Sequence, residues 1–413
     1  MSQENDRQLP DGWQWVKLGD VADLKNGINF TSNQKGSGIL TVDVLNMYPN
    51  GIYLEVNDLY RVDIKSNNEY MLQTNDILFV RSSVKEEGVA WTTLFSGHTE
   101  PVTFCGFIIR ARFLNPEISP EYFVYYCRSE AIRNFLVNKS TRGTITNINQ
   151  ESLKTLKIPL PPLSEQKRIA AILNEQMEAV EKARKATEAQ LEAAKALPAA
   201  YLRAVFESEE ANSWERRKLG DVCRVTKLAG FEYTKYVNYN PDGKYIALRA
   251  QNVRNTGLDL SNFVKITEDV ASYLSRSKLD SGDIVMTFIG ANIGEATWID
   301  KNDMFYCAPN IARITPNAEL IDCQFLTRLI HSSEFQRQIR DINESTAQQS
   351  LSMKNIRDFW VVFPTLSQQK QIASTLTEQM QEVERLKQNL KEQLDTINKL
   401  PAVLLRRAFN GEL

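Results

Sequence analysis

The chain contains very little histidine. Only two of its 413 residues are histidines, His98 and His331, and they lie far apart in the sequence. Histidine is the commonest ligand of catalytic zinc and the usual proton carrier of nucleophilic triads, so neither kind of site is expected. The sequence also lacks a GxGxxG turn, a Walker loop and an Asn/Asp-Pro-Pro-aromatic adenine-methylation motif. These absences argue against a stand-alone enzyme.

Cysteine is scarce as well. The five cysteines are odd in number and never stand in CxxC spacing; they are Cys105, Cys127, Cys223, Cys307 and Cys323. This pattern predicts buried thiols in a reducing cytoplasm and disfavours a disulfide framework or a zinc site. No run of 18 apolar residues occurs and the N-terminal stretch is polar, so we expect neither a membrane span nor a signal peptide.

Internal repetition is the strongest positive signal in the sequence. Each repeat unit is about 203 residues long, and three pairs of matching segments recur in the same order: "KLGDV" at 17–21 and 218–222, "LSEQKRIA" at 163–170 with "LSQQKQIA" at 366–373, and "LPAAYLRAVF" at 197–206 with "LPAVLLRRAF" at 400–409. A repeat of this length is too long for a solenoid. It indicates a duplicated two-domain module with internal pseudo-two-fold symmetry.

One half of each unit is expected to be a long helix. Ser164 and Ser367 follow proline-containing segments and are predicted N-caps, and Pro198 and Pro401 are predicted to kink or stop the rods. Between these points apolar residues alternate at spacings of four and three, which is typical of a coiled coil. The predicted seam comprises Leu173, Met177, Val180, Leu191, Leu376, Met380, Val383, Leu390, Leu394 and Ile397.

The two rods are expected to pair antiparallel with each other, and docking of each rod on another subunit is the alternative. A 34-residue rod would be roughly 50 Å long at 1.5 Å per residue. Arg184 and Lys387 occupy the same heptad position in the two seams. They could fix the register of the pair, or their long side chains could simply reach out to solvent.

The other half of each unit is predicted to be a mixed α/β domain with a mostly antiparallel sheet. Residues 13–160 contain strand-like runs at 38–47, 76–83, 89–94 and 106–113, followed by a helix from Ser119-Pro120 to about Leu136. The same order recurs over 214–362, with a helix from about Ile321 to Ile339. The fold class is therefore α+β, with predicted segments 1–160, 161–210, 211–362 and 363–413.

The loops of these domains are rich in side chains that read base edges or hold phosphates. Loops are polar in most proteins, but here they recur at equivalent places with different residues. The candidate DNA contacts are Asn33, Lys35, Arg81, Ser82, Lys85, Arg142, Thr144, Asn147, Arg249, Gln251, Asn252, Arg254, Asn292, Thr346, Gln348 and Gln349.

Taken together, these motifs resemble the specificity subunit of type I restriction–modification enzymes. The resemblance rests on "IPLPPLSEQKRIA" and "VVFPTLSQQKQIA", the tryptophan before each "KLGDV", "GTITNIN" at 143–149 and the final "AFNGEL", and it covers essentially the whole chain. The second copy departs from the first in having Gln368 at the place of Glu165 and "TAQQS" at the place of "GTITN".

The resemblance implies two target recognition domains that each read one half of a split, asymmetric double-stranded DNA site. It implies that the helical repeats bind two methyltransferase subunits and set the spacer, and that two motor–nuclease subunits join them. S-adenosylmethionine, ATP and Mg²⁺ would belong to those partners, and this chain would hold no cofactor or metal and carry out no catalysis. The alternatives are the specificity subunit of another bipartite restriction or methylation system, and a coiled-coil scaffold whose sheet domains bind proteins.

The nearly neutral charge of the chain is unusual for a DNA-binding protein. The chain has 49 basic and 51 acidic residues, whereas a DNA-binding domain usually has a basic excess. Residues 13–160 hold 15 of each sign, and residues 214–362 hold 19 basic and 18 acidic residues. We therefore expect basic residues to be clustered on one face and partner subunits to supply much of the phosphate neutralisation.

Overall fold

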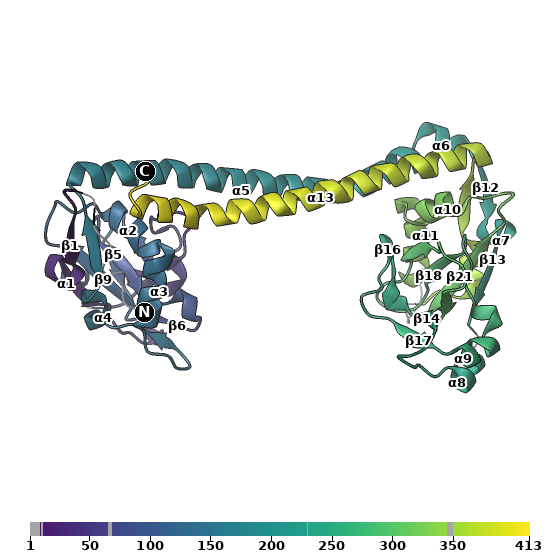
Figure 1. Ribbon diagram of the computed structural model, residues 1–413, viewed down its shortest axis with the longest axis horizontal. Coiled ribbons are helices and arrows are strands. Elements are labelled where there is room, and N and C mark those ends of the chain that lie inside the picture. The colour runs from purple at the N-terminus through teal and green to yellow at the C-terminus, as the bar shows by residue number, and fades with distance from the viewer. Residues whose placement is uncertain (1–8, 10, 65–67, 229, 345–349) are drawn as a thin grey trace. The chain divides into compact units, whose positions relative to one another are not determined.

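The computed structural model describes residues 9, 11–64, 68–228, 230–344 and 350–413. Contacts divide the chain into two units (Figure 1). Unit 1 comprises the described residues up to Ala189 together with Lys391–Leu413, and unit 2 comprises Gln190–Leu390. Among the described residues, no helix is both long enough and apolar enough to span a membrane. The predicted division into four segments stays a prediction.

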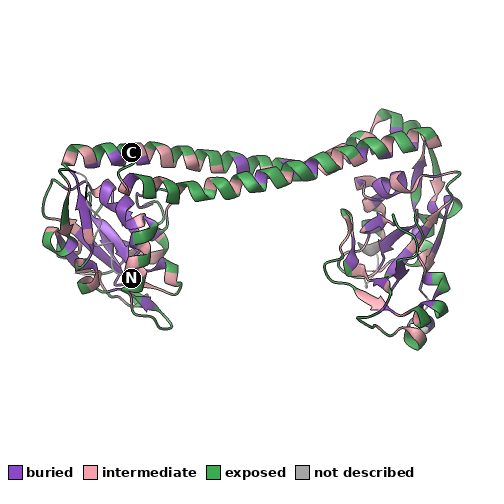
Figure 2. Cartoon of the chain, viewed as in Figure 1, coloured by how far each residue is buried: buried purple, intermediate pink, exposed green. Residues whose placement is uncertain are grey.

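Unit 1 contains two sheets. The first is antiparallel, in the order β2(Ala22–Asn26), β9(Ile108–Phe113), β5(Ile77–Val80), β7(Thr92–Leu94). The second has the order β4(Tyr60–Val62), β3(Lys35–Val42), β8(Val102–Phe104), and its β3–β8 pair is parallel. The predicted, mostly antiparallel α/β domain is confirmed. Buried apolar residues form one core against the helices and another between the sheets. Figure 2 colours the buried residues purple along the ribbon.

The two main sheets of unit 2 have the same strand order as those of unit 1. Its antiparallel sheet has the order β13(Cys223–Lys227), β21(Ile311–Pro316), β18(Ile284–Thr287), β19(Ala296–Trp298). Its second sheet has the order β17(Val264–Ile266), β14(Tyr245–Leu248), β20(Phe305–Cys307), again with one parallel pair. The duplication therefore extends through the segments whose sequences diverge. A short ladder, β15(Val253–Arg254) with β16(Gly257–Leu258), occurs in unit 2.

Each unit also has a two-stranded ladder next to its long helix. In unit 1, β1(Gln14–Lys17) pairs with β11(Lys157–Leu160), and in unit 2, β12(Glu215–Lys218) pairs with β22(Trp360–Phe363). The "KLGDV" motif spans the end of β1 or β12 and the short helix after it, α1(Leu18–Val21) or α7(Leu219–Val222).

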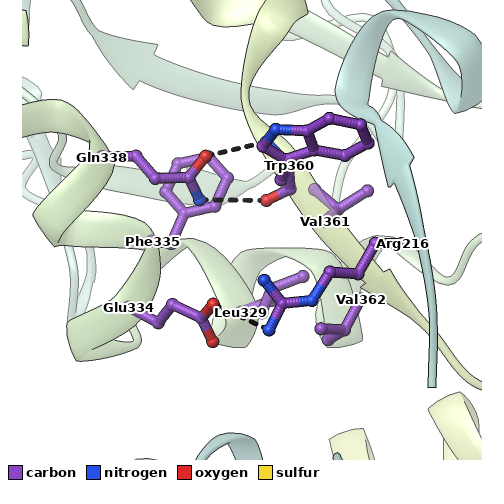
Figure 3. Close-up of a pocket in the computed structure, with 8 residues that line it drawn as sticks. All are labelled: Arg216, Leu329, Glu334, Phe335, Gln338, Trp360, Val361 and Val362. Atoms are coloured by element: carbon purple, nitrogen blue, oxygen red, sulfur yellow. Dashed lines mark hydrogen bonds and ion pairs between the residues drawn. The ribbon is translucent and has the colours of Figure 1, made fainter. Parts of the chain in front are cut away.

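Figure 3 shows how a side chain caps the edge of the second ladder. The Gln338 amide donates to the backbone oxygen of Trp360 at 3.1 Å and accepts from the backbone nitrogen of Trp360 at 2.8 Å, while Arg216 pairs with Glu334 at 3.1 Å. This pocket is lined by groups that satisfy one another, and it has space for about one water molecule, ≈ 10 Å³. The hydrogen bonds and the ion pair around it hold the β12–β22 ladder to the neighbouring helix.

The shorter helices differ from the predictions in one respect. Ser119 is the N-cap of α2(Pro120–Arg128), with Pro120 at the first helical position, as predicted. The helix does not continue to Leu136, because it breaks at Ser129 before α3(Glu130–Asn138). The Ser129 hydroxyl donates to the Tyr126 carbonyl and so ends the first helix. The second predicted helix likewise divides into α10(Cys323–Ile330) and α11(Ser333–Glu344).

The remaining short elements link the sheets and helices of each unit. In unit 1 they are α4(Gln150–Lys154) and the 3-10 turns η1(Ser32–Gln34), η2(Val44–Met47), η3(Asn68–Tyr70) and η4(Glu86–Gly88). In unit 2 they are α6(Glu209–Ser213), α8(Gly230–Tyr236), α9(Glu268–Tyr273), α12(Met353–Asp358), η5(Ala250–Asn252) and η6(Ser275–Ser277).

The two long helices are α5(Leu163–Phe206) and α13(Leu366–Phe409), of 44 residues each. They are longer than predicted, because Pro198 and Pro401 lie inside them. The predicted caps are also wrong by two residues, since α13 begins before Ser367 and the Thr365 hydroxyl accepts from the Gln368 backbone nitrogen. Threonine at this position satisfies one of the free amides that every helix start exposes.

Within each unit the start of one long helix packs beside the end of the other, so the predicted antiparallel pairing is confirmed. In unit 1, Leu173 of α5 shares a core with Leu405 and Ala408 of α13. In unit 2, Leu376 of α13 shares a core with Leu202 and Phe206 of α5. All ten predicted seam residues are buried or half-buried.

A glutamine ties each long helix to its sheet domain. The Gln166 amide accepts from the Ser119 backbone nitrogen at 2.8 Å and donates to the carbonyls of Glu117 and Pro161. Gln369 makes the matching set of bonds in unit 2, to Asp322, Leu320 and Pro364. Both glutamines are buried, at 1% and 0% exposure. Sequence reasoning did not identify this role, although both residues lie in the repeated motif.

Candidate nucleic-acid interface

In unit 1, two of the predicted loops meet through a short antiparallel ladder. β6(Ser82–Ser83) pairs with β10(Thr146–Asn147), and the Ser82 hydroxyl donates to the Asn147 side chain at 2.5 Å. Arg142 forms an ion pair with Glu86 at 2.5 Å, which adds a second link between the loops. Residues 81–88 and 140–150 therefore form one continuous surface.

An open cavity of ≈ 740 Å³ lies against this surface. Its wall includes Ser82 and Lys85 from the predicted set. It also includes apolar side chains that are unusually exposed: Leu45 at 89%, Val84 at 83%, Phe107 at 56% and Ile145 at 45%. Apolar side chains contact the thymine methyl group in the major groove or wedge between base steps in the minor groove.

These four apolar residues are the part of the candidate site that the sequence-based prediction missed. The prediction selected hydrogen-bonding residues, whereas Val84 and Ile145 are apolar residues inside otherwise polar loop segments. An apolar residue standing alone in a polar loop is the sequence feature that could have identified them. This feature points to a binding surface only when the structure shows that the four side chains line one cavity.

A partly buried hydrogen-bond network supports the cavity wall at Asp43. The Tyr60 hydroxyl donates to Asp43 at 2.9 Å, and the Cys105 thiol donates to it at 3.3 Å. Burial, with Asp43 adding to it, raises the pKa of Cys105 to about 12 and also raises the pKa of Tyr60. Both groups therefore stay protonated at neutral pH and can donate their hydrogen bonds to the Asp43 side chain.

The remaining candidates of unit 1 occupy different settings. Thr144 is exposed on the 140–150 loop. Asn33 and Lys35 are exposed but do not line the cavity, and the Lys35 ammonium lies 4.4 Å from the centroid of the Tyr60 ring. Arg81 is half-buried and donates to the Gly106 carbonyl at 3.0 Å, so it braces the loop from inside.

In unit 2, the loop at 249–262 folds back on itself. Arg249, Gln251 and Asn252 all bond to Asn262, at 3.3, 3.4 and 2.8 Å. Gln251 is exposed, but Asn252 is 1% exposed, and its amide is also bonded to the Arg249 nitrogen and the Asp259 carbonyl. We therefore assign Asn252 to the internal framework of the loop, because its hydrogen-bonding groups face inward.

A second loop lies beside the first one in unit 2. Arg254 forms an ion pair with Glu295 at 2.9 Å, and the Glu295 nitrogen donates to the Asn292 carbonyl at 3.1 Å. The bridge between Ile289 and Ser350 stands where the β6–β10 ladder stands in unit 1. Thr346, Gln348 and Gln349 lie outside the described residues.

No group of three or more His, Cys, Asp or Glu side chains that could hold a metal occurs among the described residues. The cysteines are free thiols, and four of the five are buried.

Two segments of the chain, residues 10–192 and 212–396, match the family described as the type I restriction modification DNA specificity domain. The type I restriction enzyme MjaVIII specificity subunit of Methanocaldococcus jannaschii is 24% identical over 427 residues, which cover 95% of this chain and 91% of the relative. The type I restriction enzyme EcoBI specificity subunit of Escherichia coli is 21% identical over 436 residues, covering 98% and 87%.

Solved structures show the same fold. A chain from a structural study of complex assembly and conformational transition in the type I R-M system superposes with a TM-score of 0.72 at 19% identity, covering 98% of this chain and 100% of its own length. The HsdS subunit from Thermoanaerobacter tengcongensis superposes with a TM-score of 0.64 at 20% identity, and both chains are covered completely.

Proposed function

We propose a DNA-reading role from one premise: the chain belongs to the family of the type I restriction modification DNA specificity domain. It is the sequence-specificity subunit of a type I restriction–modification complex. Each unit acts as a target recognition domain and reads one half of a bipartite double-stranded DNA site. The observation that carries this role is that one scaffold, built twice with the same strand order, presents different loops at equivalent places.

The two half-sites are expected to differ. Unit 1 presents Leu45, Val84, Phe107 and Ile145 beside Lys85, so its contacts combine apolar packing with phosphate or base hydrogen bonds. In unit 2 the 249–262 loop presents the exposed Gln251, the half-buried Arg249 and Arg254, and Leu260 at 37% exposure. An asymmetric target follows, because apolar and polar surfaces select different base edges.

The chain's partners supply the chemistry. We infer two methyltransferase subunits bound along the helical repeats, and two motor–nuclease subunits that complete the complex in the cytoplasm. S-adenosylmethionine, ATP and Mg²⁺ belong to those subunits, and this chain is non-catalytic. Each long helix contributes residues to both units, and we expect the length of the helices to set the number of unread base pairs.

The balanced charge of the two sheet domains implies that the chain alone binds DNA weakly and with a shallow salt slope, whereas the assembled complex binds tightly. Tight, steeply salt-dependent binding by the chain alone would contradict this division of labour.

Methylome sequencing of cells that express the methyltransferase partner with and without this chain tests the proposal. A bipartite methyladenine motif should appear only when the chain is present. Val84→Ser and Lys85→Ala should each weaken methylation of that motif, and Glu55→Gln, at an exposed position outside the cavity wall, serves as the matched control. If the methylome is unchanged by the chain, a protein-binding scaffold becomes the better reading.

A further inference from the structure

Unit 2 contains a large cavity of ≈ 750 Å³, which shares with its candidate DNA interface only the turn at Asn255 and Thr256. Its walls come from the end of α5, the middle of α13, helices α10 and α11 and the turn between β15 and β16. Four arginines line it: Arg203, Arg328, Arg340 and Arg385. Among the described residues of the wall the only carboxylate is Glu384, and Lys387 pairs with it at 2.7 Å. Arg385 pairs with Glu382, which lies outside the wall.

Arg328 is the unusual member of this group. It is 8% exposed, and its Nε is buried without a hydrogen-bond partner. Within the described part of the chain it makes one hydrogen bond, a long one of 3.5 Å from Nη2 to the Thr377 hydroxyl. Its guanidinium lies 5.2 Å from the centroid of the Trp298 ring. Burying a guanidinium without a carboxylate partner costs free energy of folding, because the charge loses its hydration. A bound anion would supply the missing hydrogen-bond acceptors and the opposite charge.

Other enclosed arginines have more hydrogen-bond partners than Arg328, although Arg110, Arg128 and Arg313 also each bury one nitrogen without a partner. Arg110 pairs with Asp23 at 2.5 Å, Arg313 pairs with Asp283 at 2.7 Å, and Arg128 donates to two backbone carbonyls. In unit 1 the position that corresponds to Arg328 is Tyr125, whose hydroxyl donates to Asn174 at 2.6 Å. A cation at this position of the duplicated fold therefore occurs in unit 2 and is replaced by a neutral tyrosine in unit 1.

The rest of the wall suits a ligand with an apolar body. Leu202, Trp298 and Met380 contribute apolar surface, and the cavity is within the size range of small-molecule sites. His331 adds no charge, because desolvation and the nearby Arg328 lower its pKa to about 4, and its ring bonds to the Ala296 carbonyl at 2.7 Å. The guanidinium fork of Arg328 matches the geometry of a phosphate group.

We propose that the cavity containing Arg328 binds a small organic phosphate of the nucleotide type, with Arg328 and the neighbouring arginines on the phosphate and the apolar wall on the organic part. A bound ligand would bridge the long helices to α10 and β19 and stabilise unit 2. The depth of Arg328 favours a free ligand over the backbone of a DNA duplex.

Isothermal titration of the full chain with ADP, inorganic phosphate and adenosine tests this site. ADP should bind, phosphate should compete with it, and adenosine should bind at least about tenfold more weakly because it lacks the charged group. Arg328→Met should abolish ADP binding and should leave the melting temperature of the ligand-free protein unchanged or raised, since it removes a buried unpaired charge. Arg337→Met, on the exposed face of α11, is the control.

Arg203→Met provides a second variant at an exposed position, and it should weaken ADP binding without a change in fold. Absence of binding at millimolar ADP and phosphate, or equal binding by Arg328→Met and Arg337→Met, would overturn the proposal. It would also be overturned if Arg328→Met weakened association with the methyltransferase partner and left phosphate binding intact, because the cavity would then receive an acidic protein segment.

Discussion

In unit 1 the Tyr125 hydroxyl bonds to Asn174, and at the equivalent place in unit 2 Arg328 makes a long hydrogen bond to Thr377 in the wall of a large cavity. Nearby, Gln166 and Gln369 make the same three hydrogen bonds in the two units. The comparison shows that the same few polar contacts join the long helix to the sheet domain in both units. The side chains that line the cavities and loops differ between the units. One repeated fold can therefore carry two recognition domains with different binding surfaces.

The largest expected effect concerns the buried carboxylates of the two sheets. Asp76 pairs with Arg112 at 2.6 Å, and Asp283 pairs with Arg313 at 2.7 Å, with the two carboxylates each 1% exposed by side chain. Asp76→Asn and Asp283→Asn should each destabilise their own unit by about 3 kcal/mol, because the arginine loses its charged partner. Hydrogen-exchange mass spectrometry resolves the units, and the exposed Asp58→Asn is the control.

Similar losses in the two units would support a common framework. If Asp76→Asn destabilised unit 1 and Asp283→Asn left unit 2 unchanged, the sheets would be held by different contacts and the comparison would fail.

The two anchoring glutamines should give a smaller, matched effect. Gln166→Ala or Gln369→Ala removes three hydrogen bonds and leaves buried backbone groups unpaired, so each should cost about 2 kcal/mol. The loss should appear as faster exchange at the start of α2 or α10 and of the adjoining long helix. Gln371→Ala, at an exposed position of α13, should have no measurable effect.

The pH dependence of stability should distinguish the units. The pKa of His331 is lowered to about 4 from 6.5, so the unfolded chain binds the proton more tightly and unit 2 should lose stability as the pH falls from 6.5 towards 4. At the corresponding position of unit 1, burial lowers the pKa of Arg128 to about 10, and this group stays charged throughout that range. Urea denaturation of His331→Gln should show a weaker loss than the unchanged chain, whereas an identical pH profile would argue against a neutral, desolvated ring.

The smallest effect is expected at the exposed ion pair of the unit 1 interface. The side chains of Arg142 and Glu86 are 65% and 44% exposed, so Glu86→Gln should change stability by about 0.5 kcal/mol or less. The same change frees Arg142 for phosphate and should raise the affinity of the assembled complex for DNA and steepen its salt dependence. Affinity measured at two salt concentrations checks this, and an unchanged salt slope would place Arg142 away from the DNA.

The sequence was sufficient to predict the duplication, the α+β class, the paired helices and the capping of α2 by Ser119, because repeats, apolar spacing and caps are local patterns. It did not predict that Pro198 and Pro401 would lie within the helices. A proline interrupts one backbone bond, and packing of Leu202 and Phe206 beyond the first proline compensates for that loss.

The site was less predictable than the fold for a physical reason. Composition identifies loops that can hydrogen-bond, but only tertiary structure decides which groups are already used inside the protein. Asn252 has an amide that could bond to a base, but that amide is already hydrogen-bonded within its own loop. Val84 has no polar side-chain group, yet it is 83% exposed at the cavity.

Exchanging residues 214–362 for the matching segment of a relative with a different target, followed by methylome sequencing with the same methyltransferase partner, tests the central claim most directly. Independent reading by the two units predicts a methylated motif in which one half is new, while the other half and the count of unread bases between them are retained. A motif altered in both halves, or one altered in neither, would show that the two domains do not read DNA separately.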